Sequence, residues 1–290
     1  MKAELECLEC SLRQALRAAR MACDDPAVHR QVMDAVAGDI PGMDLNESPA
    51  VLSLGLYRYA RELSGNPDPY KAIKAEQNAM ALELEPELDA LVASSGTPLL
   101  TAIRLAAAGN IIDLGIMHVH EIDPRQEIMK AMNTVPAIDH SDRFMRSLES
   151  CEHLLYLLDN AGEIVFDKPL IRALQKRTKV TAVVKAAPII NDACLEDAEQ
   201  VGLTSLCEVI DNGGAFVGSP LNLIPSEFRK RMEEADIILG KGQGNYETVD
   251  DFEGDVYLLL KIKCDVIARH CGVPRGESVF LSTRARNQKR

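Results

Sequence analysis

The chain has 290 residues, a formal net charge of −12, 47% apolar residues and 26% charged residues. This is the composition of an ordinary folded protein with one large or two ordinary domains. The acidic balance and the absence of Trp argue against nucleic acid as the main partner, because that binding depends on Lys, Arg and stacked rings. No apolar run reaches the ~18 residues of a membrane span, and the N-terminus has no signal-peptide core. We expect no membrane partner and a cytoplasmic location, while the oligomeric state is left open.

The first part of the chain, residues 1–108, predicts a helical domain. Apolar residues recur there at three- and four-residue steps, as in amphipathic helices, and proline stands at positions that suit a first helical turn. After the first helix, the expected helices begin near Pro26, Pro49, Tyr70 and Thr97. We expect the helix from Tyr70 to break or bend near Pro86. A linking helical segment is expected over 109–150, with a short helix from Asp142 to Leu148.

Cys7 and Cys10 form a C-x-x-C motif on the first predicted helix. A four-ligand zinc site would have to recruit Cys23, Cys264, Cys271 or another subunit. Reduced thiols packed on a helix are the simpler interpretation.

From residue 153 the pattern changes to strands that alternate with helices. Such alternation predicts βαβ units and a parallel sheet with both faces covered. The expected strands are 153–158, 180–184, 206–210, 236–239 and 255–260. The expected helices are 167–177, 192–200 and 225–235. The direction of the last strand is open, because only a short loop precedes it. The α/β domain, with the linking segment 109–150, is therefore expected over 109–290.

Polar and Gly-rich segments follow each of these strands. The carboxyl ends of parallel strands share one edge of a sheet, where ligands bind, so this grouping favours a binding site over unrelated Asx turns. The segments are Asp159-Asn160, Lys185 with Asn191-Asp192, Asp211 to Gly214, Gly240 to Asn245, and Lys261 with Lys263.

Asp159, Asn160 and Asp192 offer the hard oxygen ligands of one divalent cation, with Mg or Mn favoured and Co or Ni able to bind. Lysines and Gly-rich turns suit phosphate oxygens, so a phosphorylated substrate is indicated. Asn110 and Asp113 would share one helix face or act as simple caps. His118 and His120 are alternative metal ligands, although they lack partner ligands nearby and ordinary loop histidines are the simpler interpretation.

Three common nucleotide or hydrolase signatures are missing. The turn after the first strand of the predicted sheet lacks G-x-G-x-x-G, and GKGQGN is not a P-loop because it lacks G-x-x-x-x-G-K-[ST]. There is also no G-x-S-x-G elbow of an α/β hydrolase.

An ordered set of motifs resembles the damage-control phosphatases, also known as domain of unknown function 89. The motifs are GNIIDLG at 109–115, DNAGE at 159–163, Asn-Asp at 191–192, GKGQGNYE at 240–247 and LKIKCD at 260–265. The N-terminal C-x-x-C looks like the short microbial branch. The resemblance implies a helical N-terminal region on a Rossmann-like α/β/α domain with a mostly parallel sheet. It also implies metal-dependent hydrolysis of small phosphometabolites, such as sugar phosphates.

The resemblance also implies roles for individual residues. The metal ligands would be Asp159, Asn160 and Asp192, which with Lys263 form the catalytic set. The substrate side would comprise Asn110, Asp113, Glu163, Lys185, Gly240, Lys241, Gly242 and Asn245. One difference concerns Leu260 to Lys263, where larger eukaryotic members carry Arg-Thr-x-Lys. The Lys is kept and the Arg is absent, so their substrate preference should not be transferred.

The expected reaction is hydrolysis of a phosphate monoester by metal-activated water. Asp159 as a nucleophile that forms an aspartyl-phosphate is an alternative, less favoured because the residue is assigned to the metal. A non-catalytic module that binds a phosphometabolite or nucleotide is the first rival function. An S-adenosylmethionine-dependent methyltransferase is the second, and the lysines at the strand ends argue mildly against it.

Overall fold

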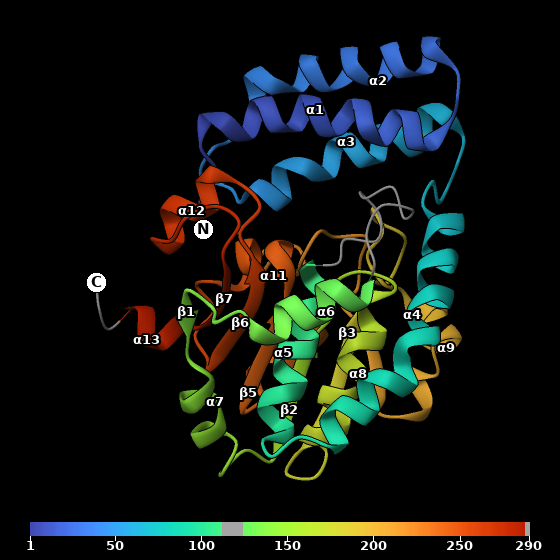
Figure 1. Ribbon diagram of the computed structural model, residues 1–290. Coiled ribbons are helices and arrows are strands. Elements are labelled where there is room, and N and C mark those ends of the chain that lie inside the picture. The colour runs from blue at the N-terminus through green and yellow to red at the C-terminus, as the bar shows by residue number, and fades with distance from the viewer. Residues whose placement is uncertain (112–123, 288–290) are drawn as a thin grey trace.

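The computed structural model of the chain describes residues 1–111 and 124–287. Seven strands in this part of the chain form one sheet, and helices precede, separate and follow them (Figure 1). The strands are β1 (Ile138–Asp139), β2 (His153–Leu157), β3 (Lys179–Val184), β4 (Glu208–Asp211), β5 (Ile237–Lys241), β6 (Val256–Lys261) and β7 (Ser278–Ser282).

The helices fall into an N-terminal group and a group that is interleaved with the strands. The first group is α1 (Leu5–Ala22), α2 (Pro26–Asp39), α3 (Pro49–Ser64), α4 (Lys71–Ala93) and α5 (Pro98–Ile111). The second is α6 (Pro124–Asn133), α7 (Ser141–Ser147), α8 (Glu163–Leu174), α9 (Leu195–Gln200), α10 (Ser226–Glu233), α11 (Gly242–Val249), α12 (Asp265–Cys271) and α13 (Thr283–Asn287). None of the described helices is long and apolar enough to cross a membrane.

The strand order is β1-β7-β6-β5-β2-β3-β4. Strands β2 to β6 are parallel to one another, β7 runs antiparallel to β6, and β1 is parallel to β7. This confirms the predicted α/β class with a mostly parallel sheet, and it shows that the last predicted strand, β6, is parallel to its neighbour β5.

Alternating side chains of the sheet enter two hydrophobic clusters, one on each face. In β2, Leu154 and Tyr156 pack on the face covered by α4, α5 and α8, whereas Leu155 and Leu157 pack on the face covered by α10 and α11. A period of two in a strand has this effect, because successive side chains point to opposite faces. The result is a three-layer α/β/α arrangement in which both faces of β2 are buried.

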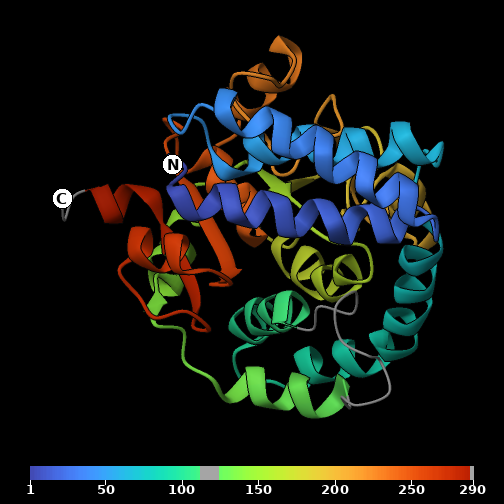
Figure 2. The same cartoon turned by 90° about the horizontal axis from the view of Figure 1, so that it is seen from above.

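Helices α1, α2 and α3 form a separate layer with its own apolar cluster. They lie across one end of the sheet (Figures 1 and 2), and Arg61 of α3 donates to the Pro188 carbonyl at 2.7 Å, in the loop after β3. Helices α4 and α5 instead contribute to the cluster on one face of the sheet. Helix α5 crosses the expected boundary at residue 108, so the division into domains 1–108 and 109–290 stays a prediction.

The structure corrects several expectations about local structure. Strands β1 and β7 were not predicted, and α8 begins at Glu163 rather than at residue 167. Helix α4 is continuous through Pro86, so of the expected break or bend the break is wrong. The Gly-rich segment after β5 is not a loop, because residues Gly242–Val249 form α11. Its side chains from Asn245 to Val249 are buried, and this tertiary packing overrides the low helix propensity of glycine.

Candidate functional site

The candidate site lies where the chain order reverses within the sheet. From β2 the chain proceeds outward through β3 to β4, and it then returns to the other side of β2 as β5. Ligands bind in α/β sheets beside the carboxyl ends of strands at such a switch point. The turns that follow β2 and β3 carry Asp159, Asn160 and Asp192, so the three predicted metal ligands reach the same edge.

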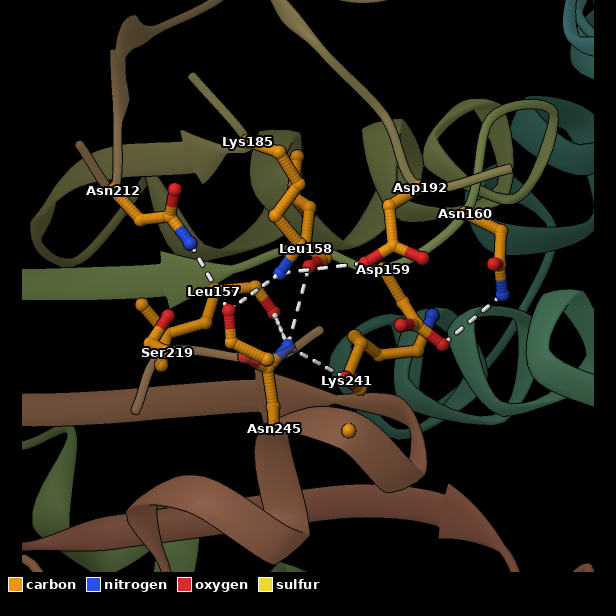
Figure 3. Close-up of polar contacts among 12 residues, drawn as sticks. Leu157, Leu158, Asp159, Asn160, Lys185, Asp192, Asn212, Ser219, Lys241 and Asn245 are labelled. Atoms are coloured by element: carbon orange, nitrogen blue, oxygen red, sulfur yellow. Dashed lines mark hydrogen bonds and ion pairs between the residues drawn. The ribbon is translucent and has the colours of Figure 1, made fainter. Parts of the chain in front are cut away.

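Backbone contacts join these two turns directly. Asn160 and Asp192 form an isolated antiparallel bridge. Ala161 N donates to the Asn191 carbonyl at 2.9 Å, and Ala193 N donates to the Asp159 carbonyl at 2.8 Å. Figure 3 shows the side chains of Asp159, Asn160 and Asp192 close together beside the strand ends. We refer to residues 159–162 and 191–194 as the two ligand turns.

Asp159 approaches the first residue of α11 so closely that only glycine fits there. Gly242 has φ +77°, and a Cβ on it would lie 1.8 Å from Asp159 Oδ2. A positive φ of this size is adopted readily by glycine alone. The Asp159 carboxylate therefore packs on the backbone at the N-terminus of α11, where a negative charge is favoured by the helix dipole.

Two amides hold the acidic side chains of the site. Asn160 Nδ2 donates to Asp159 Oδ2 and to Glu163 Oε2, both at 3.0 Å. Asn110 Nδ2 lies 3.2 Å from Asp159 Oδ2 and 3.2 Å from Glu163 Oε1, while its Oδ1 accepts from Lys261 N at 3.0 Å. Asn110 thus connects α5, the first ligand turn and the end of β6.

Lys241 at the end of β5 is engaged by carboxylates rather than open to a ligand. Its side chain is fully buried, and Nζ lies 2.7 Å from Glu163 Oε1 and 2.8 Å from Asp167 Oδ1. Tyr156 Oη also donates to Asp167 Oδ1 at 2.7 Å. The predicted role of Lys241 at the substrate has no support in this geometry, because a phosphate would have to displace these two carboxylates. We refer to Lys241, Glu163 and Asp167 as the buried ion cluster.

Lys185 and Asp192 form a looser pair. Lys185 Nζ lies 3.6 Å from Asp192 Oδ2, which is beyond a hydrogen bond, and it donates to the Gly218 carbonyl at 3.1 Å. Asp192 is 4% exposed, and its Oδ2 accepts no hydrogen bond from the described part of the chain. A buried carboxylate oxygen without a donor is costly unless a cation or another group meets it.

Burial and neighbouring carboxylates raise the pKa of Asp159 and Asp192. The pKa of Asp159 is well above its usual range because the carboxylate is buried and because Glu163 and Asp192 are near, and Lys263 and Lys185 act in the opposite direction. Burial raises the pKa of Asp192 to about 6, with Lys185 opposing the shift. A site that crowds carboxylates is suited to a cation, since an added positive charge relieves the repulsion.

The donor set therefore fits one hard divalent cation. Asp159, Asn160 and Asp192 can supply carboxylate and amide oxygens, the groups that Mg and Mn prefer. Within residues 1–111 and 124–287, no group of three or more His, Cys, Asp and Glu is arranged as a metal site, which is consistent with a set that contains an amide and needs open positions. Cys7 and Cys10 are free thiols, as are the other six cysteines.

Asn245 and Gly240 contact the ends of β2, β5 and β6. Asn245 is fully buried, and its Nδ2 donates to the carbonyls of Leu157, Leu158 and Lys241 at 3.4, 3.2 and 2.8 Å. A Cβ on Gly240 would lie 2.8 Å from Leu258 Cδ2. Both residues thus help to fix the ends of β2 and β5. Asn245 Oδ1 has no hydrogen-bond partner among the described residues, and contact of the two residues with substrate remains a prediction.

The exposed residue Lys263 lies in the loop between β6 and α12. Its backbone N donates to Gln243 Oε1 at 3.1 Å, and its charge lowers the pKa of Asp159. It remains a predicted phosphate contact. Asp113, His118 and His120 lie outside the described residues.

Some residues near the site were not predicted. Asn78 of α4 accepts from Gly162 N at 2.6 Å, and Asp197 of α9 accepts from Cys194 N at 2.9 Å. Asp167 joins the buried ion cluster from within α8. Asn78 and Asp167 are single polar residues within helices, and no local motif distinguishes them from surface positions. Asp197 is the third residue of α9 and forms a capping box with Cys194, a local signal for a helix start but not for a site.

Residues 3–279 match the family described as "Damage-control phosphatase ARMT1-like domain". A damage-control phosphatase of Pyrococcus horikoshii is 33% identical over 286 residues, which are 97% of this chain and 98% of the relative. A damage-control phosphatase of Archaeoglobus fulgidus is 33% identical over 96% of this chain and 98% of its own length. A crystal structure of a DUF89 family protein from Pyrococcus horikoshii aligns with TM-score 0.89 at 32% identity, covering 98% and 99% of the two chains.

Proposed function

The chain belongs to the ARMT1-like damage-control phosphatases, and from that premise we propose that it hydrolyses small phosphate monoesters with the help of one divalent cation. Sugar phosphates and related phosphometabolites are the proposed substrate class. One observation carries the proposal. The bridge between the two ligand turns gathers Asp159, Asn160 and Asp192 at the switch point, and the buried Asp192 Oδ2 is left without a hydrogen-bond donor from the described residues.

The proposed cation ligands are Asp159, Asn160 and Asp192. When bound, a divalent cation such as Mg, Mn, Co or Ni would polarise the phosphoryl group and activate a water as the nucleophile. The chain's own residues prepare that position. Asn110 and Asn160 hold the carboxylates of Asp159 and Glu163 in place through their Nδ2 groups, so little reorganisation is needed when charge develops.

The phosphate is proposed to bind between Lys263 and the N-terminus of α11. Lys263 is exposed and close enough to lower the pKa of Asp159. Backbone N–H groups at the start of α11 offer a second source of positive potential, since helix N-termini attract anions. Lys185, paired loosely with Asp192, would balance the negative charge that the substrate brings. Water is the proposed nucleophile, because Asp159 already contacts two amides and Gly242.

The test is phosphate release from a panel of phosphate esters by metal-stripped protein, with Mg, Mn, Co and Ni added singly. Metal-dependent release that disappears in Asp159→Asn is the expected result. A protein that binds Mn tightly and releases no phosphate from any ester would instead be a non-catalytic binding module. A covalent phosphoenzyme trapped during turnover would replace the water mechanism by an aspartyl-phosphate.

A further inference from the structure

A second polar connection, besides the backbone bridge, joins the two ligand turns through helices α4 and α9. Its central residues are Asn78 of α4, which is fully buried, and Asp197 of α9, which is 4% exposed. Both side chains reach backbone N–H groups of the turns rather than the side chains that carry the chemistry. We call the two residues the buried strap.

On the first turn, Asn78 Oδ1 accepts from Gly162 N at 2.6 Å. Gly162 follows Asn160 by two residues, has φ +73° and precedes α8. A Cβ at Gly162 would lie 3.0 Å from Gln77 Cβ, so the turn also packs closely on α4. The hydrogen bond from Gly162 therefore fixes where the first turn ends, and with it the direction of Asn160 and Glu163.

On the second turn, Asp197 Oδ2 accepts from Cys194 N at 2.9 Å. Cys194 follows Asp192 by two residues, as Gly162 follows Asn160. Asn78 Nδ2 donates to Asp197 Oδ1 at 3.1 Å and completes the connection. The two turns are thus joined by three hydrogen bonds in series, from Gly162 N through Asn78 and Asp197 to Cys194 N.

The charge of the strap is balanced by Lys74, whose Nζ lies 3.0 Å from Asp197 Oδ2 and 3.5 Å from Asp68 Oδ2. Asn78 Nδ2 also donates to Gln200 Oε1 at 2.8 Å. Each polar group of the two strap side chains therefore has a partner, and a fully satisfied buried network is rigid. Its geometry can hold the backbone of both turns at a fixed separation.

We propose that Asn78 and Asp197 are positioning residues that set the separation between Asp159–Asn160 and Asp192. The inference rests on the proposed function, because these are the proposed cation ligands. The direct backbone bridge joins the turns at Asn160 and Asp192, and the strap joins them two residues further on. Two connections between the ligand turns fix the angle between the turns as well as their separation. Residues that orient metal ligands in this way typically change metal affinity or activity 10–100-fold when replaced.

The test exchanges the two strap residues. In Asn78→Asp a carboxylate faces Asp197, and the like charges push the turns apart. In the double variant Asn78→Asp/Asp197→Asn, the amide at 197 can donate to the carboxylate at 78 and still accept from Cys194 N, so the series of hydrogen bonds is restored. Asn78→Ala removes the strap without adding charge and serves if Asn78→Asp does not fold.

Glu85→Gln is the matched control. Glu85 lies two turns further along α4 and connects this helix to α8. Lys168 Nζ and Arg172 Nη2 each lie 2.6 Å from its carboxylate. Its contacts do not involve the ligand turns. We expect this variant to lose stability while its affinity for Mn and its kcat stay at the wild-type values.

The measurements are the Kd of Mn for the metal-free protein, kcat and KM for the best ester, and hydrogen exchange at Gly162 and Cys194. Asn78→Asp should raise the Kd of Mn and lower kcat at least tenfold each, with faster exchange at both amides. The double variant should recover all three to within about threefold. Folded Asn78→Asp with unchanged exchange and unchanged Mn affinity would overturn the proposal. If wild-type protein releases no phosphate, the proposed function fails, whereas the exchange data still decide the role of the strap.

Discussion

Two groups of acidic and lysine side chains lie side by side at the carboxyl edge of the sheet, and they differ in how well they are paired. The buried ion cluster places Lys241 at 2.7 and 2.8 Å from two carboxylates. The ligand turns place Lys185 at 3.6 Å from Asp192 and leave one oxygen of Asp192 without a hydrogen-bond donor in the described chain. The residue types are the same, and each group has one carboxylate oxygen, Oδ2 of Asp167 or Oδ2 of Asp192, without a hydrogen-bond donor among the described residues. The two groups differ in how closely the lysine is held.

From this difference we assign a structural role to the buried ion cluster and the proposed chemistry to the ligand turns. A lysine held by two carboxylates in a closed space has no free capacity for a ligand, and its role is to hold β5 against α8. A crowded set of carboxylates whose lysine is only loosely paired is stabilised when another positive group joins it. The predictions below test this division, and they begin with the change of greatest expected effect.

Replacing a proposed ligand should abolish activity without a loss of stability. In Asp159→Asn we expect phosphate release to fall at least about 10³-fold, because the cation and its transition-state stabilisation are lost. The free energy of unfolding of the metal-free protein should rise by about 1 kcal/mol, since a crowded charge is removed. Phosphate release and urea unfolding are the measurements. A variant that keeps full activity would remove Asp159 from the site.

A methyl group at Gly242 should misplace Asp159. Because a Cβ there would lie 1.8 Å from Asp159 Oδ2, we expect Gly242→Ala to lower kcat about 10²-fold, as a shift of about 1 Å in a reacting group does. Gly272→Ala is the control, because Gly272 has a similar φ of +73° and nothing within 4 Å of the added Cβ. It should cost about 1 kcal/mol of stability and leave kcat unchanged. Equal losses of activity in both variants would contradict the close approach.

Lys241→Met should mainly destabilise the protein. Glu163 and Asp167 would be left buried without their counter-charge, and such a loss typically costs about 3–5 kcal/mol. Lys185→Met should lower the free energy of unfolding by less, because the distance between Lys185 and Asp192 is longer. Relative to this loss of stability, it should lower kcat/KM more than Lys241→Met does. Chemical unfolding and kcat/KM measured on both variants give the comparison. The reverse pattern would mean that the two groups have been assigned the wrong roles.

Lys263→Ala should affect the substrate and leave the metal in place. We expect KM for a phosphate ester to rise about tenfold, which is the value of one charge-assisted contact. The Kd of Mn should stay within about twofold of wild type. Steady-state kinetics and a metal titration of the same preparation are the measurements, and loss of Mn binding would place Lys263 at the cation instead.

The smallest effect is expected far from the site, at Glu208. The hydrogen bond from Lys179, together with Arg231, lowers the pKa of Glu208 from 4.5 to about 2. A lowered pKa contributes stability above pH 4.5 that is lost as the pH falls towards 2. Because the pair is more than one-third exposed, the contribution is below about 1 kcal/mol. Glu208→Gln should therefore differ from wild type in urea unfolding at pH 7, and the two should converge at pH 2.

The strands and the site edge could be predicted from the sequence because they depend on local pattern. The apolar run before Asp159 and the polar residues after each strand place β2 to β6 within about two residues. Lys241 could not be assigned, since a lysine at a strand end has the same local signal whether it faces solvent or two buried carboxylates. The helix that begins at Gly242 was missed for a related reason, because its stability comes from burial of residues such as Tyr246 and not from propensity.

The strap residues show the same principle at longer range. Asn78 and Asp197 are 119 residues apart. Considered alone, Asn78 is an ordinary polar residue of a helix, and Asp197 is a capping residue at the start of α9. Their partners are backbone groups in turns that the sequence does place at the site. The two-residue chain segment of β1 is missed for a simpler reason, since Ile138–Asp139 is too short to show a period.

The hydrogen bond between Asn110 Oδ1 and Lys261 N spans 151 residues of the chain. This hydrogen bond can form only after β6 has paired with β5. In turn, β5 pairs with β2 across a long chain segment that includes β3 and β4. Long-range parallel pairing is a slow step of folding, whereas helices form locally and early. During refolding, helical circular dichroism should therefore return well before the ability to bind Mn. Catalytic competence in this chain is therefore expected to be a late event of folding, and its recovery reports that β6 has been placed.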